Sequence, residues 1–189
     1  MMKKFWISSA LLLGLWQTGG AYAAPVTINF TGRVIVATCD VTVNGAVNSA
    51  SVTLPNVNTS AITGTLGTEA VMGRTLFTVG LANCNSALGP GQQARISLTG
   101  NFIPTRPKIM QNTAASPANG VGLYIAQEAT PGVSLPLDNT RSLNIGPAAA
   151  SVAQLQGATL RLIAGYVSTG GAVGPGNVQG TTTLTYDVV

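Results

Sequence analysis

Apolar and polar positions alternate near the start of the chain, between residues 26 and 34. The apolar or glycine positions of this stretch and its continuation are Val26, Ile28, Phe30, Gly32, Val34 and Val36. Because successive side chains of an extended strand point to opposite faces, the pattern predicts a β-strand with one apolar face. No Asn-Gly or Asp-Gly turn follows within a hairpin's reach, so the simplest pairing with a neighbouring strand is missing. The strand is therefore a candidate for an arm rather than a core element.

The rest of the chain consists of short runs rich in Val, Ile, Thr, Leu and Tyr, separated by Gly, Pro, Asn and Ser. Leu184, Tyr186 and Val188 share one face of the last run. The predicted strands are residues 39–43, 50–54, 76–82, 94–98, 122–126, 143–145, 159–166 and 181–188. Helix is scarce, with a turn or two expected only at residues 148–155 and 58–62. Many short strands with frequent turns predict an all-β sandwich.

One stretch, residues 100–119, does not show a strand pattern over its length. It contains three prolines together with Arg106 and Lys108. Because proline and clustered polar residues mark turns and loops, the stretch is predicted to be an exposed insertion.

Residues 1–23 have the features of a secretory signal peptide. Two lysines precede an apolar run over residues 5–16, and an Ala-Tyr-Ala tripeptide follows at residues 21–23. The apolar run is too short for a good membrane span. We therefore predict that the chain is exported and that the mature protein begins at Ala24.

The chain carries few charges. Charged residues make up 7% of the sequence, against about 25% in an ordinary globular domain. Without the signal peptide, seven basic residues face five acidic ones. The basic residues are scattered, which excludes the dense basic face that nucleic-acid binding requires. Composition leaves two interpretations open: an extracellular protein rich in small polar residues, or a surface that neighbouring molecules cover.

The sequence offers little for catalysis. Cys39 and Cys84 lie in the exported part, where a single disulfide is the natural expectation. The chain has no histidine, which excludes Ser-His-Asp and Cys-His arrangements. The five acidic residues show no paired spacing, and no cluster has the composition of a metal site. We predict that the protein is not an enzyme and uses no cofactor or metal.

Both ends of the exported chain are predicted strands in which apolar and polar residues alternate. Such strands can pair with strands of another molecule when subunits assemble. A sandwich with an open groove exposes unpaired backbone groups and invites a strand from another chain. Alternatively, both end strands are ordinary edge strands of one closed sandwich. Periodicity alone does not decide between these interpretations.

Several segments occur together along the exported chain and carry a resemblance to a known family. They are FTGRVIVATC at residues 30–39, FTVGLANC at 77–84, GVGL at 120–123, GYVSTGG at 165–171, Pro175-Gly176, and the final TTTLTYDVV. By these segments the chain resembles type 1 fimbrial subunits, which are pilins of the chaperone-usher pathway.

The resemblance implies an incomplete immunoglobulin-like β-sandwich that lacks its last strand and has an N-terminal donor-strand extension. It divides the exported chain into a donor-strand arm, residues 24–36, and a pilin domain, residues 37–189. It implies a structural subunit of a bacterial surface fimbrium that supports cell adhesion. A periplasmic chaperone lends a strand to the groove. At the outer-membrane usher, the arm of the next fimbrial subunit replaces that strand. The chain would pass through the periplasm to the cell-surface fimbrium.

Residue by residue, the resemblance assigns three sets of positions. The donor-strand arm inserts Val26, Ile28, Phe30 and Val34 into a neighbour, and Gly32 lets the arm lie close. The family disulfide matches Cys39 and Cys84. The C-terminal edge that the chaperone and the next subunit bind matches Gly176, Leu184, Tyr186 and Val188.

The chain departs from the family pattern in two places. Val188 stands where an aromatic residue is usual, while Tyr186 lies two positions earlier on the same face. The arm is short, which is closer to minor tip subunits than to major shaft subunits. The alternative function is a fimbrial adhesin that itself binds a host glycan or protein receptor through surface loops, for which the insertion at residues 100–119 is the candidate.

Overall fold

The computed structural model describes residues 39–63, 72–128, 135–136 and 138–189. All of them belong to one compact unit, Ile35–Val189. The predictions for the signal peptide and for the donor-strand arm concern residues outside these ranges.

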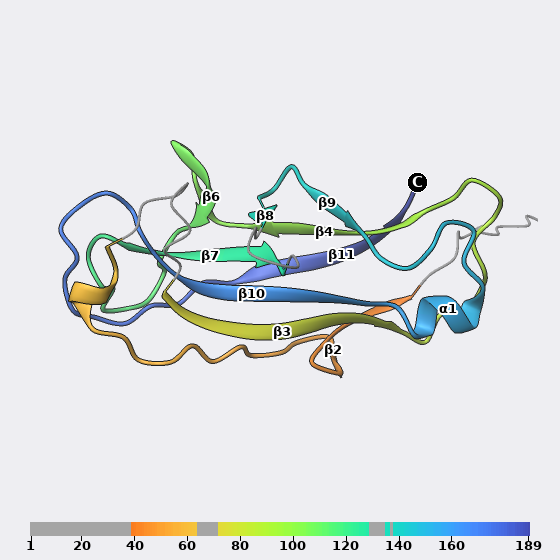
Figure 1. Cartoon of the computed structure of the whole chain (residues 1–189), viewed down its shortest axis with the longest axis horizontal. Helices are drawn as coiled ribbons and strands as arrows, with labels where there is room; N and C mark the ends of the chain where they lie inside the picture. Colours follow the sequence, from red (N-terminus) through yellow and green to blue (C-terminus); the bar gives the residue numbers. More distant parts are fainter. Residues whose placement is uncertain (1–38, 64–71, 129–134, 137) are drawn as a thin grey trace, which may run out of the picture. The chain divides into compact units, whose positions relative to one another are not determined.

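Most strands belong to one large antiparallel sheet (Figure 1). In spatial order its main path is β2 (Ala46–Val47), β1 (Asp40–Val43), β3 (Met72–Ala82), β10 (Thr159–Ser168), β7 (Val121–Gln127), β6 (Arg106–Met110) and β5 (Phe102–Ile103). A further strand, β8 (Leu135–Pro136), also pairs with β7. The centre of this sheet is the pair of long ladders that β10 makes with β3 and β7.

A smaller antiparallel sheet contains β4 (Ala94–Gly100) between β11 (Thr182–Val188) and β9 (Ser142–Asn144). The described helices are short: the 3-10 helix η1 (Thr59–Ala61) and α1 (Val152–Gln156). The first turn of α1 is fixed by a capping box in which Ser151 and Gln154 bond each other's backbone N–H groups.

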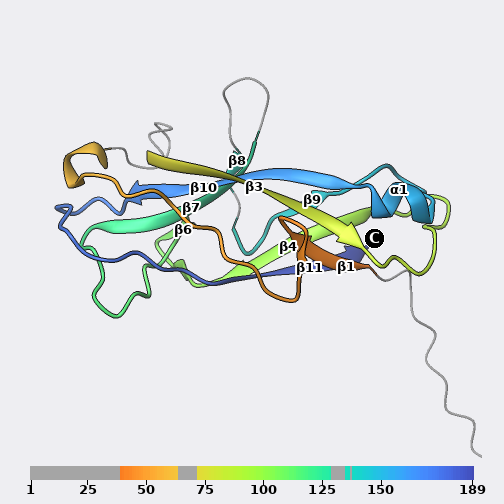
Figure 2. The same ribbon diagram turned by 90° about the horizontal axis from the view of Figure 1, so that it is seen from below.

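The hydrophobic core lies between the two sheets, which Figure 2 shows as separate layers. Alternate residues of each strand point inward, as a strand's period of two requires. The small sheet contributes Ala94, Ile96 and Leu98 from β4. The large sheet contributes residues such as Val79 of β3 and Leu162 of β10. The predicted all-β sandwich is confirmed.

The prediction of an exposed insertion at residues 100–119 is wrong for much of that stretch. It contains β5 and β6, and Ile109 and Met110 are almost completely buried. Gly122 of β7 permits this packing, because a Cβ there would overlap Ile109. Proline misled the prediction: Pro107 lies inside β6, a short strand that pairs with β7 at one described position. Proline is tolerated in such weakly paired strands.

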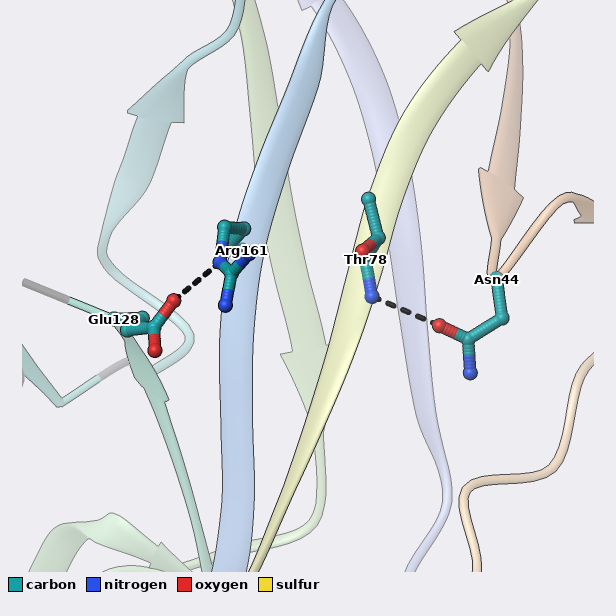
Figure 3. A network of polar contacts seen from close by, with 4 residues as sticks. All are labelled: Asn44, Thr78, Glu128 and Arg161. Carbon is teal, nitrogen blue, oxygen red and sulfur yellow. Dashed lines mark hydrogen bonds and ion pairs between the residues drawn. The ribbon is translucent and has the colours of Figure 1, made fainter.

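A tight hairpin, which was not among the turns predicted from the sequence, joins β1 to β2. Asn44 and Gly45 both have positive φ, the conformation of a two-residue turn of this type. Figure 3 shows the Asn44 side chain accepting a hydrogen bond of 2.9 Å from the Thr78 N–H of β3. The same view shows Arg161 of β10 paired with Glu128, which follows β7. This ion pair is largely exposed, so it contributes little to stability.

Candidate functional site

The last strand of the sandwich, β11, is paired along one edge. It forms a continuous antiparallel ladder with β4, from Thr182 opposite Gly100 to Val188 opposite Ala94. No strand in the described part of the chain pairs with its other edge. Such an edge presents a row of N–H and C=O groups that another strand can bond.

Across from this edge runs a segment, residues 50–57, that we call the facing segment. The prediction of a strand at residues 50–54 is wrong, because the structure assigns these residues to no strand. Their side chains nevertheless alternate, with Val52 and Leu54 half-buried and Ser51 and Thr53 exposed. One described bond ties the segment to the large sheet, from the Thr75 hydroxyl to the Thr53 carbonyl. The facing segment therefore has the side-chain pattern of a strand without a strand partner.

A groove of about 1290 Å³ lies between the facing segment and residues 174–184, which lead into β11. Its floor is apolar and comes from the large sheet: Phe77, Met110, Leu123, Ile125, Ala164 and Tyr166. Phe77, Met110 and Ile125 are core residues with less than a tenth of their surface exposed. The groove is therefore an opening in the hydrophobic core itself.

The groove is nearly uncharged. Its one described charged residue is Asp40, next to the disulfide, and that carboxylate accepts a hydrogen bond from the Asn83 amide. Among the residues that the structure describes, no group of three or more His, Cys, Asp or Glu side chains could hold a metal ion. No described helix is long and apolar enough to cross a membrane. The chemistry of the site is thus that of apolar packing and backbone hydrogen bonding.

Cys39 and Cys84 form a disulfide. Cys39 precedes β1 and Cys84 follows β3, so the bond joins the ends of two paired strands. Cys39 and Val41 line one end of the groove, where β1 lies close to β11 (Figure 2). The disulfide therefore anchors the strand at one end of the groove.

The predicted C-terminal edge residues lie in two different places. Leu184, Tyr186 and Val188 point inward from β11 and are half-buried, and Leu184 lines the groove. Gly176 is not on β11. Its φ is +154°, and a Cβ there would lie 2.5 Å from the Ala118 backbone nitrogen. Gly176 is therefore required where the chain passes close to residues 117–118, six positions before the strand.

Tyr186 stands apart from the other inward residues of β11 because it carries a hydroxyl. The hydroxyl oxygen is buried and has no hydrogen-bond partner in the described part of the structure. Burial raises the pKa of Tyr186 above its usual value of 10.0, and the neighbouring Asp187 carboxylate raises it further. Burial also raises the pKa of Tyr166 in the groove floor. The folded chain therefore holds both phenolic protons more tightly than the unfolded chain.

We expect the Tyr186→Phe variant to be more resistant to alkali than the wild type. A pKa that folding raises contributes stability that is fully present below the unfolded value of about 10 and is lost as the pH rises through the folded pKa. Phenylalanine has no ionisable group, so the variant lacks the part of this alkaline loss of stability that the Tyr186 phenol causes. Thermal unfolding measured between about pH 8 and pH 11 should show a shallower decline for Tyr186→Phe.

At pH 7 the same variant should unfold at the wild-type temperature or higher, because the change removes a buried hydroxyl without a partner. Tyr166→Phe is the matched comparison, because burial also raises the pKa of the Tyr166 phenol in the wild type. If the unfolding temperature fell equally with rising pH in the wild type and in both variants, the raised pKa values of Tyr166 and Tyr186 would be contradicted.

Sequence reasoning missed the groove floor and the role of the facing segment. The alternation of Val52 and Leu54 was a usable signal for a strand-like wall. The floor gave no such signal, because its six residues come from four strands that are distant in sequence.

No protein-family model and no curated protein sequence matches the chain. Among solved structures, it is similar to the P pilus rod subunit PapA, with 15% identity, a TM-score of 0.49, and coverage of 85% of this chain and 98% of that one. It is also similar to the CupB6 tip adhesin from Pseudomonas aeruginosa, with 17% identity, a TM-score of 0.42, and coverage of 60% of this chain and 29% of that one. Both likenesses are distant, so the free edge of β11 and the groove beside it are the basis for a functional interpretation.

Proposed function

We propose that this chain is a structural subunit of a bacterial surface fimbrium, and that its groove receives the N-terminal arm, residues 24–36, of a neighbouring subunit. One observation carries the proposal: a sheet edge without a described partner lies beside an opening into the apolar core. An added strand would bond the edge of β11 through its backbone and fill the groove with alternate side chains.

The dimensions of arm and groove are compatible. Seven residues form β11, which corresponds to about 24 Å of antiparallel strand. The thirteen residues of the arm reach about 44 Å when extended at the same rise per residue. The arm is therefore long enough to follow the whole edge. A groove of about 1290 Å³ also exceeds the roughly 300–1,000 Å³ of an ordinary small-molecule pocket.

The character of the two surfaces is also compatible. As an extended strand, the arm would place Val26, Ile28 and Phe30 on one face, and its sequence has a single charged residue, Arg33. The groove has an apolar floor and one described charged residue. Burying unpaired charge is costly, so a nearly uncharged groove favours a nearly uncharged strand.

In this proposal the groove has two successive occupants. A strand from a periplasmic chaperone fills it before assembly, and at the outer-membrane usher the arm of another subunit takes its place. The chain would thus be exported through the periplasm and end in the cell-surface fimbrium, where it supports adhesion. Its partners are other fimbrial subunits, the chaperone and the usher.

The adhesin alternative receives less support from the described residues. It relied on residues 100–119 as a free surface loop. Residues 112–119 are instead bonded to residues 174–179 by several backbone hydrogen bonds, such as Thr113 N–H to the Gln179 carbonyl at 2.8 Å. A stretch held in this way is better suited to supporting the groove wall than to adapting to a receptor.

The Phe30→Asp variant of the exported chain tests the proposal. A carboxylate on the apolar face of the arm should prevent its insertion, so the variant should remain monomeric where the wild type forms fibres. Thr31→Asp is the matched control, because residue 31 lies on the other face of the predicted strand and should tolerate the charge. Light scattering and electron microscopy of the purified chains would compare them.

The Phe30→Asp chain keeps its own groove, so it should still bind a wild-type peptide of residues 24–36. Fibres of Phe30→Asp as abundant as those of Thr31→Asp would overturn the proposal. A failure to bind the peptide would also overturn it.

A further inference from the structure

Residues 112–119 and 174–179 meet in a network of hydrogen bonds that we call the polar seam. At its centre is Asn112, whose side chain is half-buried. Its Nδ2 donates to the carbonyls of Ala118 and Asn177, at 3.4 and 2.9 Å. Its Oδ1 accepts from the N–H groups of Ala114 and Gln179, at 3.2 and 3.0 Å. An amide side chain has two donors and two acceptor positions, so Asn112 is fully satisfied.

Backbone contacts continue the polar seam on both sides of Asn112. Asn177 donates to the Ser116 carbonyl at 2.8 Å, and Ala118 donates to the Asn177 carbonyl at 2.9 Å. The Thr113 hydroxyl adds a bond of 3.2 Å to the Gln179 carbonyl. The close passage at Gly176 leaves no space for a side chain. Contacts with residues 112–118 therefore hold the backbone of residues 176–179 in place.

The polar seam lies directly behind one wall of the groove. Residues 174–181 line the groove and lead into Thr182, the first residue of β11, whereas Asn112 is not among the lining residues. Val178, between the two seam residues Asn177 and Gln179, also packs against the core. Asn112 can therefore act on an incoming strand only through the wall that it holds.

We propose that Asn112 is a positioning residue that holds residues 176–179 in their receiving conformation before a donor strand arrives. This inference rests on the proposed function, because it concerns the same groove. Ordering a wall at the moment of binding costs conformational entropy, whereas a wall that is already ordered does not incur that cost. The polar seam thus makes the groove a preformed acceptor and speeds the entry of the strand.

The Asn112→Asp variant gives the sharpest test, in the full exported chain that also carries Phe30→Asp to prevent self-association. Aspartate keeps an oxygen for the Ala114 and Gln179 N–H groups. It replaces the donating amide with an oxygen that faces the carbonyls of Ala118 and Asn177. At pH 7 we expect the association rate of a labelled peptide of residues 24–36 to fall by about 10- to 100-fold, with a smaller change in its dissociation rate.

Lowering the pH distinguishes the loss of the bonds that residue 112 donates to the Ala118 and Asn177 carbonyls from a general disruption of the fold. Protonated aspartic acid regains an O–H donor, so the association rate of Asn112→Asp should recover toward that of the parent chain at about pH 4. Asn119→Asp is the matched control. It makes the same chemical change, but Asn119 joins the polar seam only through its backbone carbonyl, which accepts from the Gly174 N–H. Because the Asn119 side chain is exposed and makes none of the described bonds of the polar seam, the association rate of Asn119→Asp should equal the parent's at both pH values.

The outcomes separate this inference from the proposed function. If the Phe30→Asp parent does not bind the peptide, the proposed function itself fails. If the parent binds and Asn112→Asp binds at the same rate at pH 7, the positioning role of Asn112 is overturned. Should Asn112→Asp not fold, Thr113→Val removes one side-chain bond of the polar seam and should slow association several-fold. A parental rate in folded Thr113→Val would then overturn the proposal.

Discussion

Replacing Cys39 and Cys84 by serine should lower the free energy of unfolding by about 4 kcal/mol. The disulfide closes a loop of 45 positions. In the chain-entropy model a cross-link of this span removes much of the freedom of the unfolded chain, and that freedom returns when the bond is absent. A loss of this size is a large part of the 5–15 kcal/mol that stabilises a typical domain.

Urea unfolding of the oxidised wild type and of the double serine variant would measure the effect. The urea concentration at the midpoint of unfolding should be much lower for the double serine variant than for the oxidised wild type. Reduction of the wild type should reproduce most of the fall, which controls for the loss of the buried Cys84 side chain itself. A difference below about 1 kcal/mol between oxidised wild type and variant would contradict this estimate.

The second large effect concerns binding rather than stability. Val52→Asp in the facing segment should weaken binding of a peptide of residues 24–36 by about 100-fold, because an unpaired carboxylate is costly to bury. In the free chain Val52 is half-buried at the side of the groove, so a carboxylate there can stay hydrated. An inserted strand would cover it, and an ionised carboxylate without a partner is costly to bury. The free energy of unfolding of the unbound chain should change much less than the affinity.

Ser51→Asp is the matched control for this variant. Residue 51 also borders the groove, but it is the exposed neighbour of the half-buried Val52. An inserted strand should therefore leave a carboxylate at residue 51 in contact with water. Fluorescence titration of the labelled peptide against both variants, in the Phe30→Asp chain, would give the two affinities. Equal affinities for Val52→Asp and Ser51→Asp would mean that the donor strand does not pass along the facing segment.

Local patterns in the sequence predicted the strands well where the strands are long. The alternation around Phe77, the apolar run of residues 159–166 and the period of Leu184, Tyr186 and Val188 all correspond to strands of the sandwich. In β11 the side-chain period and the burial pattern agree, because one face of the strand lies on the core. The continuous apolar run of β10 instead corresponds to a strand that is buried on both faces along most of its length.

Other features depend on contacts that no local pattern contains. Residues 50–54 have the alternation of a strand but lie beside a groove rather than a partner strand. Pro107 suggested a loop, although the burial of Ile109 and Met110 places them in the packed sheet structure. The hydrogen bonds of Asn112 join residues up to 67 positions apart in the sequence. Only the folded topology brings such residues together.

The arrangement of the small sheet also has a consequence for the rate at which the chain folds. Its central strand β4 must find β11, and the side-chain bond from Thr182 to the Thr99 carbonyl spans 83 positions. Closing long loops is entropically costly before any contact compensates for it, so topologies with such distant pairings fold slowly. We expect the more local β5–β6 hairpin to form early, while the apolar face of β4 is still exposed. The free chain would then be most prone to aggregate during that interval, before β11 docks.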